Sequence, residues 1–226
     1  MGENHSSASK SSTLRFILVP AAITLAITIL RLVGELQHWP APLFNSSAGG
    51  GAAIIGISWL PIIFGPWFAL KLAGRGEGPA SAGKSIGFTL LGLFVLVAGG
   101  FLSFQREFHF SLRALLGFIL MLLAAFVPWR AWPALIKTLI AYAYAARIPV
   151  LIVMYFALQG QWGTHYDAVP ASIPSGMSFG QKFLVLAVLP QLFFWIGYTV
   201  ILGSLIGIIA TAIVRRGKPV PETAAS

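Results

Sequence analysis

The chain has 226 residues, of which 57% are hydrophobic and only 9% are charged, and its mean hydropathy is +0.84. A water-soluble fold of this size cannot bury so much apolar surface, so the composition excludes a soluble globular protein. The formal charge of +9 does not indicate a nucleic-acid binder, because the basic residues punctuate apolar runs instead of gathering on one polar face. We therefore expect a protein embedded in the lipid bilayer, with no nucleic-acid partner.

Six apolar segments are long enough to cross about 30 Å of hydrocarbon, which predicts an all-α fold, a polytopic transmembrane helix bundle. The chain begins with residues 1–13, small and polar, which we expect to be a disordered tail. Residues 215–226 are predicted to form a basic, polar C-terminal tail. The predicted spans cover residues 14–34, 52–73, 85–104, 111–129, 131–158 and 183–214.

Lysines and arginines predict the orientation of the bundle. Six spans place both termini on one side, and cytoplasmic loops carry an excess of basic residues. Under this topology the side of the termini holds ten of them, namely Lys10, Arg15, Lys71, Arg75, Lys84, Arg130, Lys137, Arg215, Arg216 and Lys218. The other side holds four, which are Arg31, Arg106, Arg113 and Lys182. We therefore expect both termini in the cytoplasm, in a bacterial cytoplasmic membrane.

One basic residue, Arg147, lies deep inside the fifth predicted span. At about 1.5 Å per residue it is roughly 16 Å below Leu158, near the middle of the bilayer. A charge at that depth is costly and marks a functional site by default. Pro149 follows two residues later and predicts a break in the helix that gives the guanidinium backbone carbonyl partners.

Two polar stripes are predicted to share a cavity with this arginine. Tyr144 and Tyr155 fall on its helical face, whereas Tyr142 points elsewhere. Residues 191, 195 and 198 recur at helical spacing on the last span, although such a row is more often packed core than ligand site. A guanidinium offers a fixed charge and a fork of donors, which favours an anionic solute or lipid head group. The predicted ligand-binding residues are Arg147, Tyr144, Tyr155, Tyr198 and Gln191.

Histidines and carboxylates recur in pairs in the three predicted outer loops. These groups bind divalent metals such as zinc without cysteine, which this chain lacks, and they also serve as general acids and bases. If the loops converge, they predict a metal site at His38, Glu107, His165 and Asp167. Glu35, in the first outer loop, can instead pair with Arg31 four residues earlier. No metalloprotease or nucleophile-elbow motif is present.

The sequence supports three hypotheses of function. The first is a protein that binds or moves a small, anionic solute or a lipid head group through an outward-facing polar cavity around Arg147. The second is a membrane-embedded enzyme that uses a divalent metal on its outer loops. The third is an accessory subunit without chemistry. Gly203 and Gly207 form a GxxxG motif that lets helices approach closely, either within one chain or between two copies in an oligomer.

Overall fold

Every regular element in the described part of the chain is a helix. The structure is a computed structural model and describes residues 3–104 and 111–216, with side chains between residues 13 and 214. The α-helices are α1 (Glu3–Leu36), α2 (Leu60–Gly74), α3 (Ala82–Ser103), α4 (Leu112–Ala124), α5 (Pro133–Gly160), α6 (Phe179–Phe183) and α7 (Trp195–Arg216). Shorter segments are the 3-10 turns η1 (Ala48–Gly50) and η2 (Val127–Arg130) and the π-helical segments η3 (Leu184–Val188) and η4 (Pro190–Phe194).

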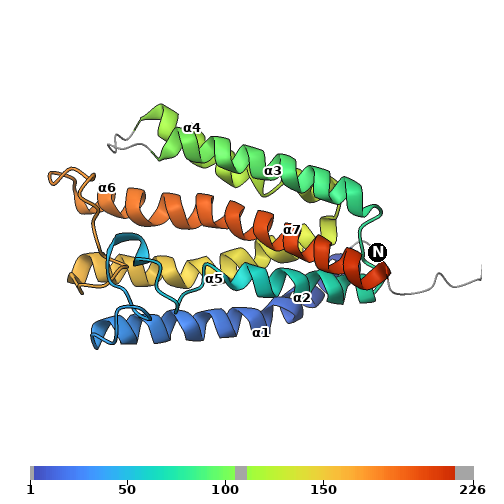
Figure 1. Cartoon of the computed structure of the whole chain (residues 1–226), viewed down its shortest axis with the longest axis horizontal. Helices are drawn as coiled ribbons and strands as arrows, with labels where there is room; N and C mark the ends of the chain where they lie inside the picture. The colour runs from blue at the N-terminus through green and yellow to red at the C-terminus, as the bar shows by residue number, and fades with distance from the viewer. Residues whose placement is uncertain (1–2, 105–110, 217–226) are drawn as a thin grey trace, which may run out of the picture.

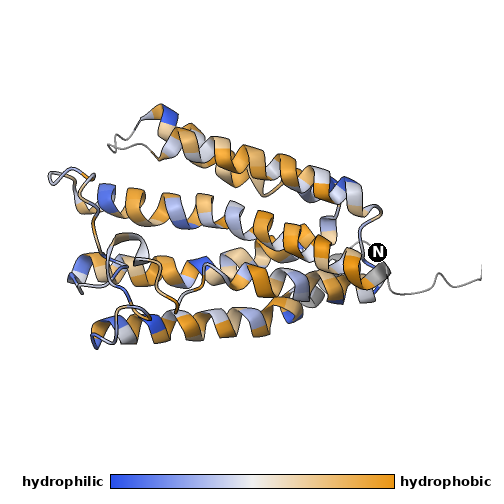
Figure 2. Ribbon diagram, in the orientation of Figure 1, coloured by the Kyte–Doolittle hydropathy of each residue, from blue (hydrophilic) through white to orange (hydrophobic). Residues whose placement is uncertain are grey.

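Five helical stretches are long and apolar enough to cross a membrane: Thr13–Leu36, Ala82–Ser103, Leu112–Arg130, Pro133–Gly160 and Phe179–Val214. Because the bilayer core offers no hydrogen-bond partners, helices that satisfy their own backbone groups are the expected way to cross it. The predicted all-α transmembrane bundle is therefore confirmed. Figure 2 shows hydrophobic residues along the length of the helices and hydrophilic ones mainly towards the two ends.

The second predicted span, residues 52–73, is only partly helical. Helix α2 has 15 residues and begins at Leu60, so it rises only about 22 Å along the bundle. Four consecutive residues, Gly49 to Ala52, have positive φ, which a right-handed helix cannot contain. Pro61 lies in the first turn of α2, where its missing N–H costs nothing. Residues 37–59 therefore form an irregular segment at one end of the bundle.

The first and last spans differ from their predicted bounds. Helix α1 already includes Glu3, within the segment predicted to be a disordered tail, and its apolar part begins at Thr13. The last helical run begins at Phe179 instead of residue 183. Around Pro190 it widens into η3 and η4, so the backbone accommodates the proline with π turns.

The start of α1 and the end of α7 lie at the same end of the bundle, which we call the terminal end (Figure 1). The irregular segment 37–59 and the connection between α5 and α6 lie at the opposite end, which we call the loop end. Helices α3 and α4 form a hairpin beside α7, while α1 and α5 lie together on its other side (Figure 1). The largest part of the irregular backbone thus lies in the half of the bundle nearer the loop end.

Helix α2 packs closely against α7 through glycines. Gly65 faces Gly203, and a Cβ atom added at Gly65 would overlap the backbone of Gly203. A Cβ atom added at Gly207 would come within 2.9 Å of the carbonyl oxygen of Gly65. The GxxxG motif is therefore occupied within one chain, where it allows two helix backbones to touch. An oligomer stays a prediction, but these two glycines already have a partner helix.

We predict that Gly65→Ala lowers the melting temperature of the purified protein, because overpacking of this kind costs roughly 1–3 kcal/mol. The matched control is Gly87→Ala on α3, where an added Cβ meets no atom within 4 Å. Alanine also favours helix over glycine by about 1 kcal/mol, so the control variant should melt at or above the wild-type temperature. Equal melting of both variants would contradict the close α2–α7 contact.

Candidate functional site

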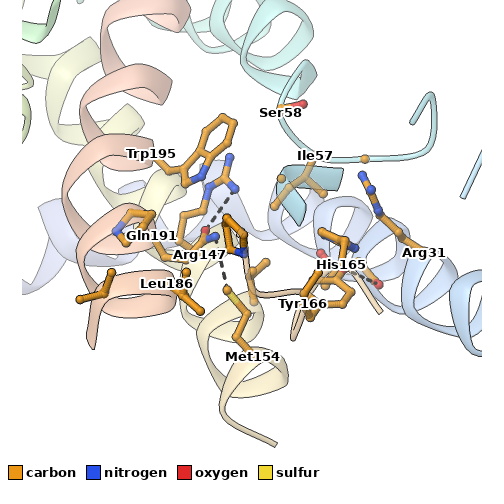
Figure 3. A pocket seen from close by; sticks show the side chains of 18 of the residues that line it. Arg31, Ile57, Ser58, Arg147, Met154, His165, Tyr166, Leu186, Gln191 and Trp195 are labelled. Atoms are coloured by element: carbon orange, nitrogen blue, oxygen red, sulfur yellow. Dashed lines mark hydrogen bonds between the residues drawn. The ribbon is translucent and has the colours of Figure 1, made fainter. Parts of the chain in front are cut away.

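A cavity of about 400 Å³ lies among α1, α5, η3, η4 and the segments at the loop end. This volume falls in the range of small-ligand sites in proteins, roughly 300–1,000 Å³. Much of its lining is apolar, including Ile27, Ile57, Val150, Met154, Ile173 and Leu186. Two arginines from different helices, Arg31 and Arg147, reach the same space (Figure 3).

Arg147 projects from α5 into the cavity wall and is only 4% exposed. Its Nη1 donates a hydrogen bond to Oε1 of Gln191 at 3.3 Å. Its guanidinium lies over the ring of Trp195, with 4.3 Å between Cζ and the ring centroid. Gln191 in turn donates through Nε2 to the sulfur of Met154 at 3.6 Å. The cation is therefore oriented by one amide and one aromatic face (Figure 3).

No carboxylate neutralises Arg147 within the described residues. The arginine–carboxylate ion pair found there joins Arg31 to Glu35, and the same carboxylate also accepts from His165. The Nε of Arg147 is buried without any hydrogen-bond partner. A cation–π contact contributes about 2 kcal/mol when desolvated, well below the cost of moving a full charge out of water. This side of the cavity therefore carries an uncompensated positive charge.

The sequence predicted a break at Pro149 in the helix that carries Arg147, and this prediction is wrong. Helix α5 is continuous through that proline, and among the described residues no backbone carbonyl accepts from the guanidinium. The partners come from the next span instead. There Gln191 lies in the π segment η4 and Trp195 follows directly at its end. Such π segments recur at functional sites, because the extra residue per turn redirects side chains.

A second charged cluster joins three parts of the chain at the loop end. Nε of Arg31 donates to Oε1 of Glu35 at 2.8 Å, which confirms the pair expected from their spacing. The backbone N–H of His165 donates to Oε2 of Glu35 at 2.7 Å, and its ring Nδ1 lies 2.6 Å from Oε1. A carboxylate can only accept, so Nδ1 of His165 carries the proton in this bond. Glu35 thus ties α1 to the loop of residues 161–178.

Arg31 also holds the irregular segment 37–59 in place. Its Nη2 donates to the backbone carbonyl oxygens of Asn45 at 3.2 Å and Gly50 at 3.0 Å. A side chain at Gly50 would meet this guanidinium, and its φ of 79° also favours glycine. The segment folded over Arg31 then contributes Gly56, Ile57 and Ser58 to the cavity lining.

The predicted ligand-binding residues do not all reach the cavity. Arg147 and Gln191 line it and contact each other. Tyr144, Tyr155 and Tyr198 are not among its lining residues. Tyr155 packs in an aromatic cluster with Phe156, Phe179 and Phe183, and Tyr198 packs on Phe194 and Trp195. That any of the five binds a ligand stays a prediction.

The predicted metal-binding residues are only partly brought together. His165 faces Glu35, while Asp167 accepts from the backbone N–H groups of Gly163 and Thr164 and so caps its own turn. His38 is exposed on a turn with φ of 53°. Glu107 lies outside the described residues. Among the described residues, no three histidines or carboxylates form a metal-binding group. The metal site stays an untested prediction.

Two features of the site escaped the sequence analysis. Arg31 and Tyr166 line the cavity, and their separation in sequence gives no sign that they meet there. The pairing of Glu35 with His165 spans 130 residues and likewise has no local signal. No protein-family model, curated protein or solved structure matches this chain.

Burial lowers the pKa of His165 below its usual 6.5, and the nearby charge of Arg31 acts in the same direction, against the hydrogen bond to Glu35. The unfolded chain then binds more protons than the folded protein just below pH 6.5, so stability rises with pH across that window. We predict that the melting temperature falls as the pH drops below about 6.5.

The variant His165→Asn should flatten this dependence, because an amide keeps a donor near Nδ1 without titrating. The matched control is His38→Asn, at an exposed left-handed position that asparagine tolerates. It should retain the wild-type slope of melting temperature against pH. If His165→Asn also retained that slope, His165 would not be the titrating group.

Proposed function

We propose that this multi-pass membrane protein binds a small anion, or the anionic head group of a larger molecule, in the cavity beside Arg147. Binding there would be the recognition step whether the ligand is held or moved across the bilayer. The observation that carries the proposal is a guanidinium that is 4% exposed, lines a cavity and has an unpartnered Nε.

A buried charge without a partner destabilises a fold by several kcal/mol. A purely structural side chain at this position would be apolar, because lipid-embedded helices pack well without charge. Arg147 instead retains donors that neither Gln191 nor Trp195 occupies. An anionic ligand would neutralise the charge and accept those donors, which makes ligand binding the best-supported role for this residue.

The orientation belongs to the same proposal. Basic residues gather at the end of the bundle where α1 starts and α7 ends: Lys71 and Arg75 at the end of α2, Lys84 in the first turn of α3 and Arg130 in η2. The positive-inside rule would put that end in the cytoplasm of a bacterial cell. The cavity would then face the outer side of the cytoplasmic membrane, where it could accept a ligand from outside.

The first test is a thermal-shift panel of acetate, octanoate, sulfate and inorganic phosphate on the detergent-solubilised protein. We predict that at least one anion raises the melting temperature and that Arg147→Gln removes this effect, because no other uncompensated cation lies in the described lining. The matched control Arg130→Gln changes an exposed arginine at the far end of the bundle and should respond like the wild type. Shifts that persist in Arg147→Gln would refute the site.

A second test separates ligand binding from structural support. We predict that Arg147→Met raises the melting temperature in the absence of ligand, by an amount corresponding to roughly 1–4 kcal/mol, because a buried charge is replaced by an apolar chain of similar length. The same variant should lose the anion-induced shift. A fall in melting temperature would instead indicate that the contacts with Gln191 and Trp195 make Arg147 a structural element.

A further inference from the structure

We infer that the ligand is an amphiphilic monoanion, with one singly charged head group and a hydrocarbon chain. The inference rests on the proposed function and adds the class of molecule that the cavity accepts. It follows from two properties of the lining, which are its net charge and the order of polar and apolar residues along α5.

The charge of the lining matches a single negative charge. Arg31 is already paired with Glu35 at 2.8 Å, and the same carboxylate accepts from His165. Arg147 is left as the one uncompensated cation in the described lining. A dianion such as inorganic phosphate would bring a second, unpaired charge into a largely apolar space, which is unfavourable. A carboxylate or a phosphate diester carries one charge and can accept two parallel bonds from a guanidinium.

The walls between Arg147 and the loop end match a hydrocarbon chain. Helix α5 runs towards the loop end, so Val150 and Met154 follow Arg147 on that side, roughly 5 and 11 Å further along the helix. Leu186 and Ile57 line the same space from other segments (Figure 3). Along α5 the charged residue therefore lies deeper than these apolar residues. A head group bound there would leave its chain along these apolar side chains.

This arrangement disfavours a small hydrated anion. Such an anion would lose its water against largely apolar walls and would meet only one uncompensated cation in the described lining. Each methylene that the walls remove from water should instead tighten binding by up to about fourfold. The expected signature is an affinity that rises with chain length while the head group stays constant.

The experiment measures binding of acetate, butanoate, hexanoate and octanoate to the full chain in lipid nanodiscs by equilibrium dialysis, with empty nanodiscs as the reference. We expect affinity to rise at each step of the series and octanoate to bind at least tenfold more tightly than octanol, which lacks the charge. Equal affinity of octanoate and octanol would overturn the inference, and so would equal affinity of acetate and octanoate.

A matched pair of variants tests the wall. Leu186 lines the cavity, whereas Leu184, in the same π segment, is 37% exposed and lies outside the lining. Leu186→Ser should weaken octanoate binding by about tenfold or more and leave acetate binding unchanged, and retained acetate binding shows that the variant is folded. The Leu184→Ser variant should bind acetate and octanoate like the wild type. Equal loss of octanoate in the two variants would overturn the assignment of the chain to this wall.

The outcomes separate the inference from the proposed function. If acetate and octanoate bind equally and both depend on Arg147, the cavity is an anion site, and only the inference that its ligand is amphiphilic is wrong. If the Arg147→Gln variant binds octanoate like the wild type, the proposed anion site and the amphiphilic ligand are both wrong.

Nanodiscs of phosphatidylglycerol and of phosphatidylcholine identify the source of the head group. Competition with octanoate by the anionic lipid alone assigns a lipid phosphate, and no competition by either assigns a free carboxylate.

Discussion

The shape of the loop end depends on the hydrogen bonds that the buried carboxylate of Glu35 accepts. It is fully buried and accepts from Arg31 on its own helix and from His165 in the loop between α5 and α6. Through Arg31 it also fixes the carbonyl oxygens of Asn45 and Gly50. One acidic side chain thus connects α1 to two irregular segments. Because a buried pair is costly to break, these segments are held as walls of the cavity.

The two arginines of the cavity differ in how their buried charges are compensated. Arg31 has a carboxylate and two backbone carbonyls as partners, so its role in the fold is explained. Arg147 has one amide oxygen and one aromatic ring, and its Nε has none. The difference lies in their neighbours, because among the described residues a carboxylate pairs with Arg31 and none pairs with Arg147.

Irregular backbone creates the space between these two residues. Helix α2 begins only at Leu60, so part of the half of the bundle nearer the loop end is formed by the segment before it. The close contact of Gly65 with Gly203 holds α2 against the part of α7 nearer the termini. On the other wall, η4 presents Gln191 and leads into Trp195. A bundle of straight, complete helices would fill this region with side chains.

Composition and apolar length determined the class of the fold, because only helices can bury their own polar backbone groups across a bilayer. The sequence also pointed to Arg147, since a charge inside such a run is conspicuous, and to the pairing of Arg31 with Glu35 at helical spacing. It did not reveal that α2 starts late, that Tyr155 packs away from the cavity, or that His165 meets Glu35. Those facts depend on how helices rotate and pack, and on contacts between residues far apart in the chain. Only the tertiary structure decided them.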